Sequence, residues 1–340
     1  MVKINNLLAT AIVCWCLSSA NTAFGKQMGT VPTVKNSLQA AVTQNKNALT
    51  NFEQGANLYK QGDLKGAEAA FRKAIQLEPK FVEAYVALGN TLDDGGKPQE
   101  AIAQYQKAIS IDPKFAKAHF FLGNSLYVQG KFTEAIAEYK QAINFNPKHA
   151  EAHYYLGNAF YAQGKPAEAV SEYTTAIRLN PKNAASYNAL GNVLYAEGKL
   201  EEAIAQYQKA ISVDAQDADA HYNLASALYA QGKLDEAIAD YTQAIRLNPK
   251  HAQAYTGLAN AMDDRGKPQE AIAHYKKAIS LVPDYAYAYY NLGITLGREQ
   301  QREEAIVNFK KARELFQAEE NNQMVEQIDR LIEKLKVSRE

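Results

Sequence analysis

Residues 82–115 read VEAYVALGNTLDDGGKPQEAIAQYQKAISIDPKF, and close variants of this stretch recur along the chain at intervals of 34 residues. Three residue types keep the same register. The alanines are Ala67, Ala101, Ala135, Ala169, Ala203, Ala237, Ala271 and Ala305. The prolines are Pro79, Pro113, Pro147, Pro181, Pro249 and Pro283, with Ala215 in the vacant position. The glycines are Gly55, Gly89, Gly123, Gly157, Gly191 and Gly293, with Ala225 and Ala259. Because repeated units bury their apolar faces against their neighbours, the sequence predicts one stacked array rather than several globular domains.

Each unit contains two segments with helical spacing, separated by a glycine. In one unit the first segment carries Tyr187, Leu190, Gly191 and Leu194, and the second carries Ala203, Ile204, Tyr207, Ala210 and Ile211. The intervening Gly198 supplies the left-handed residue that ends a helix. The recurring prolines must lie between units, since a proline inside a helix costs about 3 kcal/mol. Each unit is therefore predicted to be a helical hairpin.

Glycine at the eighth place of the unit indicates close packing, because it costs about 1 kcal/mol relative to alanine inside a helix. We expect the partner helix to approach closely there. The large aromatic residues of the second segment are expected to fill space toward the next unit. They are Phe71, Tyr105, Tyr139, Tyr173, Tyr207, Tyr241, Tyr275 and Phe309.

The pattern resembles that of the tetratricopeptide repeat family. One unit carries the family's positions as Tyr85, Leu88, Gly89, Leu92, Gly96, Ala101, Tyr105, Ala108 and Pro113. The resemblance implies an all-α fold, a right-handed α-solenoid of eight 34-residue helical hairpins plus a C-terminal capping helix. The eight repeats are expected over 48–319, at 48–81, 82–115, 116–149, 150–183, 184–217, 218–251, 252–285 and 286–319.

The two ends of the chain lie outside the repeat. Residues 1–25 begin with Lys3, continue with an apolar run and end in small residues, which is the order of a secretory signal peptide. Residues 26–47 are polar and are expected to form a spacer. Residues 320–340 are expected to form a capping helix and tail, whose apolar stripe is Met324, Ile328, Leu331 and Leu335. We therefore expect export to a periplasmic or secreted location, with membrane contact only if the N-terminal segment stays uncleaved.

Composition and motifs exclude several functions. The 37 Lys and Arg residues balance the 37 Asp and Glu residues, so no overall field favours nucleic acid. Both cysteines, Cys14 and Cys16, lie inside the predicted signal peptide. We find no catalytic constellation and no phosphate-binding glycine loop. The sequence therefore predicts a protein that is not an enzyme, with no cofactor and no small-molecule substrate.

The resemblance implies that first helices line a concave groove with their fifth, ninth, twelfth and thirteenth places. The expected peptide-binding residues are Asn90, Asn124, Asn158, Asn192 and Asn260, with Tyr127, Tyr154, Tyr161, Tyr195, Tyr222 and Tyr229. An amide can both donate to and accept from a peptide backbone, and tyrosine is enriched at binding surfaces. The alternative is that these Asn side chains hold helices together and the Tyr rings merely pack.

Two acidic pairs interrupt this pattern. Asp93 with Asp94, and Asp263 with Asp264, place negative charge at the twelfth and thirteenth places of two units. They either favour a basic partner segment or form a solvated surface. The strings LDDGGKPQEAIAQY (from Leu92) and MDDRGKPQEAIAHY (from Met262) nearly match at a distance of 170 residues.

Histidines offer a weaker alternative site. His149 and His153 are four residues apart, a spacing that places two imidazoles on one helix face. His119 and His221 occupy the same place as His153 in other units, where the family holds a packing aromatic. We expect a protein–protein interaction scaffold that binds an extended segment and assists assembly or maturation of an envelope or membrane complex. The alternative is a metal-binding delivery factor.

Overall fold

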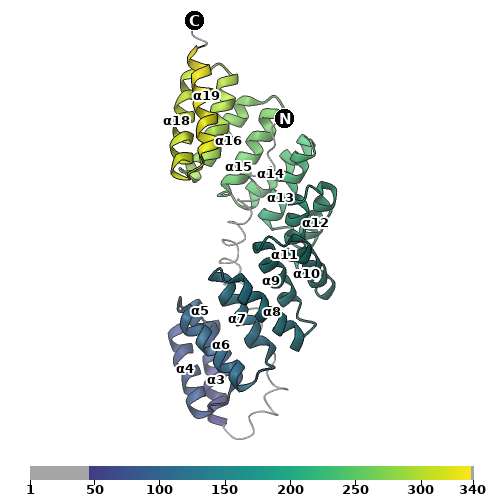
Figure 1. Ribbon diagram of the computed structural model, residues 1–340, viewed down its shortest axis with the longest axis vertical. Helices are drawn as coiled ribbons and strands as arrows, with labels where there is room; N and C mark the ends of the chain where they lie inside the picture. Colours follow the sequence, from purple (N-terminus) through teal and green to yellow (C-terminus); the bar gives the residue numbers. More distant parts are fainter. Residues whose placement is uncertain (1–45, 338–340) are drawn as a thin grey trace. The chain divides into compact units, whose positions relative to one another are not determined.

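The computed structural model describes residues 46–337, and this range forms 17 α-helices without a β-strand (Figure 1). The N-terminal unit, residues 46–182, contains α3 (Lys46–Lys60), α4 (Leu64–Leu77), α5 (Val82–Asp94), α6 (Pro98–Ile111), α7 (Ala116–Val128), α8 (Phe132–Phe145), α9 (Ala150–Ala162) and α10 (Pro166–Leu179). The predicted signal peptide and nearly all of the predicted spacer lie outside the described residues.

The C-terminal unit, residues 183–337, continues the same pattern. Its helices are α11 (Ala184–Ala196), α12 (Leu200–Val213), α13 (Ala218–Ala230), α14 (Leu234–Leu247), α15 (Ala252–Asp264), α16 (Pro268–Leu281), α17 (Ala286–Arg298), α18 (Arg302–Ala318) and α19 (Asn322–Val337). No helix between residues 46 and 337 combines the length and apolar character needed to cross a membrane.

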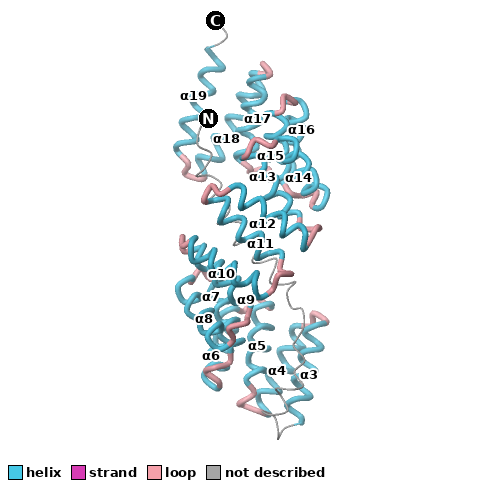
Figure 2. The backbone as a smooth tube through the Cα atoms, turned by 90° about the vertical axis from the view of Figure 1, so that its right-hand side faces the viewer, coloured by secondary structure: helices cyan, strands magenta, loops and turns pink. Residues whose placement is uncertain are grey.

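Within each unit, consecutive helices pack against one another in pairs. Odd-numbered helices from α3 to α17 are the first helices of hairpins, and the even-numbered helices are the second. Figure 2 shows the short loops that join them. First helices of neighbouring hairpins also contact each other: α3 contacts α5, and α11 contacts α13. The predicted all-α array of stacked hairpins is confirmed, whereas the individual repeat boundaries stay a prediction.

The glycine at the eighth place makes room for an aromatic ring of the same hairpin. A Cβ atom on Gly89 would lie 2.3 Å from Cε1 of Tyr105, and one on Gly157 would lie 2.7 Å from Cε1 of Tyr173. Such distances are far inside van der Waals contact. The expected close approach is confirmed. The aromatic residue, however, packs first on its own hairpin and only then reaches the next one, as Tyr105 does to Phe121 at 6.0 Å between ring centroids.

The glycine between the two helices of each hairpin has the predicted left-handed conformation. Its φ lies between 72° and 81° in Gly62, Gly96, Gly130, Gly164, Gly198, Gly232 and Gly266. In the last hairpin Gln300 takes this role with a φ of 62°. Pro98, Pro166 and Pro268 then begin the second helix, where a missing N–H costs nothing.

At several joints between hairpins, a side chain just before the proline position accepts a hydrogen bond from the backbone of the turn. Asp112 Oδ1 accepts a hydrogen bond from the Lys114 N–H at 3.0 Å, and Asn180 Oδ1 accepts one from Lys182 at 3.2 Å. The joint that contains Ala215 keeps this bond, from Gln216 N–H to Asp214 at 3.0 Å. The side chain therefore closes the turn even where proline is absent.

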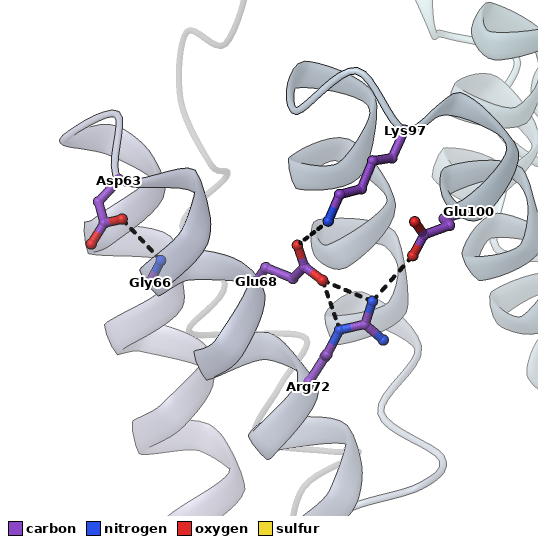
Figure 3. Close-up of polar contacts among 6 residues, drawn as sticks. All are labelled: Asp63, Gly66, Glu68, Arg72, Lys97 and Glu100. Atoms are coloured by element: carbon purple, nitrogen blue, oxygen red, sulfur yellow. Dashed lines mark hydrogen bonds and ion pairs between the residues drawn. The ribbon is translucent and has the colours of Figure 1, made fainter.

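Ion pairs join the second helices of the first two hairpins (Figure 3). Glu68 on α4 lies 2.8 Å from Arg72 and 3.0 Å from Lys97, and Arg72 reaches Glu100 on α6 at 3.4 Å. Figure 3 also shows Asp63, which caps α4 by accepting from the Gly66 N–H at 2.9 Å. Because most of these side chains are exposed, each pair contributes only a few tenths of a kcal/mol.

The C-terminal helix α19 packs against α18, as expected for a cap. Met324, Ile328 and Ile332 are buried, whereas Leu331 and Leu335 are only partly buried. The four predicted residues therefore all pack on the core, and Ile332 is a further buried residue that the sequence analysis did not name. Ile332 lies one turn beyond Ile328 and faces the core, so Leu331 lies at the edge of the contact.

Candidate functional site

Side chains of first helices meet across neighbouring hairpins within each unit. In the N-terminal unit the Tyr59 hydroxyl on α3 donates to Asp94 on α5, and the Ser125 hydroxyl on α7 donates to Asp93 at 2.5 Å. In the C-terminal unit Asn223 on α13 donates to Asn188 on α11 at 3.0 Å. We call the fifth, ninth, twelfth and thirteenth places of the first helices the first-helix face.

The asparagines at the ninth place each accept a hydrogen bond inside their own hairpin. The donor is always the second-helix tyrosine 15 residues further on. The pairs are Tyr105 to Asn90 (2.8 Å), Tyr139 to Asn124 (2.8 Å), Tyr173 to Asn158 (2.7 Å), Tyr207 to Asn192 (2.8 Å) and Tyr275 to Asn260 (2.7 Å). The structural alternative for these amides is therefore realised at every one of the five positions.

The same amides keep a second function open. Within residues 46–337, no hydrogen bond is formed by the Nδ2 group of any of these five asparagines. Asn124 and Asn192 are buried, whereas Asn90, Asn158 and Asn260 are half-buried. The Oδ1 atom is held by the tyrosine, so the N–H donors on the other side of the amide plane have a fixed direction.

The predicted tyrosines divide into two groups. Tyr127 is only 1% exposed and packs against Phe132 at 5.3 Å, so it belongs to the core. The other five are half-buried and present part of their surface on the first-helix face. They are Tyr154, Tyr161, Tyr195, Tyr222 and Tyr229. Burial raises the pKa of the Tyr195 hydroxyl to about 12, so it remains a neutral donor at physiological pH.

Two of these tyrosines lie on aromatic neighbours. The ring centroids of Tyr154 and Tyr173 are 5.9 Å apart, and those of Tyr222 and Tyr241 are also 5.9 Å apart. The rings are therefore held in place before any partner arrives, which lowers the entropy cost of binding.

The two candidate metal ligands have different structural roles. His149 caps α9, where its Nδ1 atom accepts from the Ala152 N–H at 3.2 Å and its ring lies 4.6 Å from Phe120. Burial lowers the pKa of His149 to about 4. His153 instead pairs through Nδ1 with Glu172 at 2.7 Å. Residues 46–337 contain no group of three or more potential ligands, so the structure brings no support for a metal centre.

His153 belongs to a recurring pair that sequence reasoning missed. His119 contacts Glu138 at 2.7 Å and His221 contacts Asp240 at 2.8 Å, again with the acid 19 residues further on. The signal in the sequence that could have revealed these pairs is the constant spacing of 19 residues between the histidine and the acidic residue. Burial lowers the pKa of His119, but the Glu138 carboxylate and the Pro113 carbonyl outweigh it and raise the pKa overall.

The two acidic pairs differ in their surroundings. Asp93 accepts from Ser125 and from Tyr105 (2.9 Å), both of them neutral donors. Burial raises the pKa of Asp93 and of Asp94. Asp263, by contrast, forms an ion pair with Arg298.

The stacked hairpins and the periodic first-helix face define the class of helical-repeat proteins. Residues 115–328, more than half of the 340-residue chain, match the family model of the cilia and flagella-associated protein 70 C-terminal domain, a tetratricopeptide repeat domain. Residues 55–94 and 89–127 match the model of the tetratricopeptide repeat. The chain belongs to the tetratricopeptide repeat family. A comparison with curated proteins finds no match.

Solved structures share this fold. The APC/C hetero-tetramer Cut9–Hcn1 is similar with a TM-score of 0.61 at 20% identity, over 76% of this chain and 50% of that chain. A tetratricopeptide repeat protein from Parabacteroides merdae has a TM-score of 0.56 at 21% identity, over 74% of this chain and 100% of its own. Pseudomonas aeruginosa pilF has a TM-score of 0.56 at 23% identity, over 60% of this chain and 93% of its own. The chain thus spans half the length of the Cut9–Hcn1 chain it matches.

The fold supports a protein-interaction scaffold with protein or peptide partners. Proteins of this repeat family generally act without catalysis, through the surfaces that their stacked helices present.

Proposed function

We propose that this protein is a non-catalytic scaffold that binds an extended partner segment along its first-helix face, in the groove expected from the family resemblance. The observation that carries this proposal is the recurring amide whose Oδ1 is held by tyrosine and whose Nδ2 has no acceptor among residues 46–337. Such donors recur in five of the eight hairpins, at Asn90, Asn124, Asn158, Asn192 and Asn260. They suit the backbone carbonyls of a peptide whatever its side chains are.

The half-buried tyrosines would add contact area beside these donors. Tyr154 and Tyr161 lie on α9 of the N-terminal unit, and Tyr222 and Tyr229 lie on α13 of the C-terminal unit. A ring that is already packed on one side loses little freedom when a partner covers the other side. We therefore expect the contacts to the partner's backbone to tolerate many partner sequences. Selectivity would arise only where a side chain of the partner meets a specific pocket or charge.

The chain itself suggests the substitution that tests this proposal. In the sixth hairpin the ninth place is Ser226, which accepts from Tyr241 at 3.1 Å while its own hydroxyl donates to the Tyr222 carbonyl at 2.9 Å. Serine therefore keeps the internal acceptor and removes the outward N–H donors. Asn90→Ser with Asn158→Ser should leave folding intact, because an equivalent hairpin already carries serine.

The experiment first captures the partner and then measures its affinity. A photo-crosslinking residue at Ala162, beside Tyr161 on α9, should capture a partner from a native extract. The same residue at the exposed Gln141 on α8 should not. The double serine variant should bind the captured partner about tenfold more weakly, since each lost hydrogen bond contributes roughly 0.5–1.5 kcal/mol. Equal capture at both positions, or unchanged affinity, would contradict the proposal.

We further propose that the scaffold acts in an exported compartment, where it assists assembly or maturation of an envelope or membrane complex. Support comes from the sequence of residues 1–25. The intact mass of protein purified from its natural source should correspond to a chain cut after Ala20, Ala23 or Gly25. A mass that retains Cys14 and Cys16 would contradict cleavage.

A further inference from the structure

One local site occurs twice in this molecule, 170 residues apart. Three hydrogen bonds of the N-terminal unit reappear in the C-terminal unit between equivalent residues. They are Tyr59–Asp94 and Tyr229–Asp264, Tyr105–Asn90 and Tyr275–Asn260, and Ser125–Asp93 and Thr295–Asp263. The two copies therefore share an acidic pair, and hydroxyl groups at equivalent places donate to it.

The copies differ at the thirteenth place of the following first helix. In the C-terminal copy this place is Arg298, whose guanidinium pairs with Asp263 and leaves that side chain only 8% exposed. In the N-terminal copy the equivalent residue is Val128, which is 46% exposed. The C-terminal copy thus shows which chemical group this arrangement accepts.

The N-terminal copy lacks its cation. Among residues 46–337, no lysine, arginine or histidine forms an ion pair with Asp93 or Asp94. Nearby Lys97 is directed to Glu68 instead, at 3.0 Å. A partly buried carboxylate that is held only by neutral donors pays a desolvation cost that an opposite charge would relieve.

We propose that Asp93 and Asp94 form a binding site for the guanidinium group of an arginine in the partner segment. This inference rests on the proposed function and specifies one side chain that the segment must carry. The planar guanidinium suits the site better than an ammonium group, because it can donate to several oxygen atoms at once. The exposed Val128 lies where the arginine's aliphatic stem would run.

Two short capped alanine–serine peptides test this site on the full chain. One carries a single central arginine, and the other carries citrulline, which has nearly the same shape without the charge. Calorimetry should show the arginine peptide binding at least tenfold more tightly than the citrulline peptide. Capped free arginine serves as a third probe, and it should bind more weakly than the peptide if the ligand is a polypeptide segment.

Three variants follow from the duplicated site. Val128→Arg copies Arg298 and should occupy the site internally, so it should abolish the preference for arginine over citrulline. Asp93→Asn should do the same. Arg298→Val should free the second copy and raise the stoichiometry for the arginine peptide from one to two. Glu134→Gln, an exposed carboxylate on α8, is the matched control and should change nothing.

The outcomes separate this inference from the proposed function. If the arginine and citrulline peptides bind equally, or if neither binds, the arginine site is wrong. The scaffold proposal survives the first result because its backbone donors are unaffected. If Val128→Arg leaves the arginine preference unchanged although it melts normally, the site is also wrong. Binding of capped free arginine as tightly as the peptide would instead show a small-molecule site and contradict the assignment to a partner segment.

Discussion

A single side chain on the first-helix face can hold its own hairpin together and also offer hydrogen-bond donors to a partner. The ninth-place asparagine accepts from the tyrosine of its own hairpin, as Asn158 does from Tyr173 at 2.7 Å. Sequence alone left open whether this amide serves the fold or a partner. The structure establishes the first role and leaves the donors free for the proposed second one, because one amide carries both an acceptor and two donors.

His149 shows how a residue predicted for one role takes another. Its spacing from His153 suggested two metal ligands, but it lies just before α9 and caps it. His251 caps α15 in the same way, with its Nδ1 atom 3.2 Å from the Ala254 nitrogen. Position relative to the helix start was readable from the sequence. The burial that keeps the ring neutral was not, since it comes from packing against Phe120 on another helix.

We predict that His149 makes the fold sensitive to mild acid. Its pKa falls from 6.5 to about 4 on folding, so between these values only the unfolded chain binds the proton. Stability is therefore full above pH 6.5 and falls as the pH drops toward 4, by at most about 3 kcal/mol. His149→Asn keeps the cap and removes this titration. Urea unfolding should show a smaller acid-induced loss for the variant.

The control is a measurement at a pH where residue 149 is neutral in both the wild type and the variant, folded or unfolded. At pH 8 the wild type and His149→Asn should have similar free energies of unfolding, within about 1 kcal/mol. Parallel curves of stability against pH between 8 and 4 would show that His149 is not the responsible group.

Helices and turns follow the 34-residue repeat closely, and the departures occur at its C-terminal end. Seven hairpins turn through a glycine in the left-handed region, whereas the eighth uses Gln300 with a φ of 62°. A residue with a Cβ atom is disfavoured there by about 1–2 kcal/mol. The helix α19, which ends the stack, buries Ile328 completely and protects the apolar side of the last hairpin.

We predict that Gln300→Gly stabilises the chain. The substitution removes the left-handed strain but increases the freedom of the unfolded chain, so the net gain is up to about 1 kcal/mol. The reverse change, Gly266→Gln, should cost a similar amount, because a Cβ at Gly266 meets no atom within 4 Å and the effect comes only from its φ of 81°. Urea unfolding measures both. A loss of stability in Gln300→Gly would disprove the strain argument.

At the scale of the whole molecule, the described chain consists of two compact units that divide at residues 182 and 183. Each has its own buried core. One core contains Phe52, Phe71 and Tyr105 in the N-terminal unit, and another contains Phe309, Phe316 and Ile328 in the C-terminal unit. Stability in such arrays comes mainly from interactions between neighbouring hairpins.

We predict that residues 46–182 and residues 183–340 each fold when produced separately. Each fragment should show a helical circular dichroism spectrum and a cooperative thermal transition, because each retains its internal neighbour contacts. The C-terminal fragment should have the higher melting temperature, since α19 covers its last hairpin. A fragment that remains unfolded would show that stability depends on the intact chain.

The sequence by itself determined the hairpins, their order and the glycine turns. These follow from local periodicity, from the left-handed preference of glycine and from the cost of proline inside a helix. The turn glycine recurs in seven hairpins and the proline at six joints, so each signal is repeated many times. Only the tertiary structure decided how the side chains on these helices are used. Whether Asn158 is held by Tyr173, and whether an aspartate such as Asp263 finds a cation, depends on helices that lie 15 to 35 residues apart in the chain. Local periodicity carries no information about such distances, because packing between helices sets them.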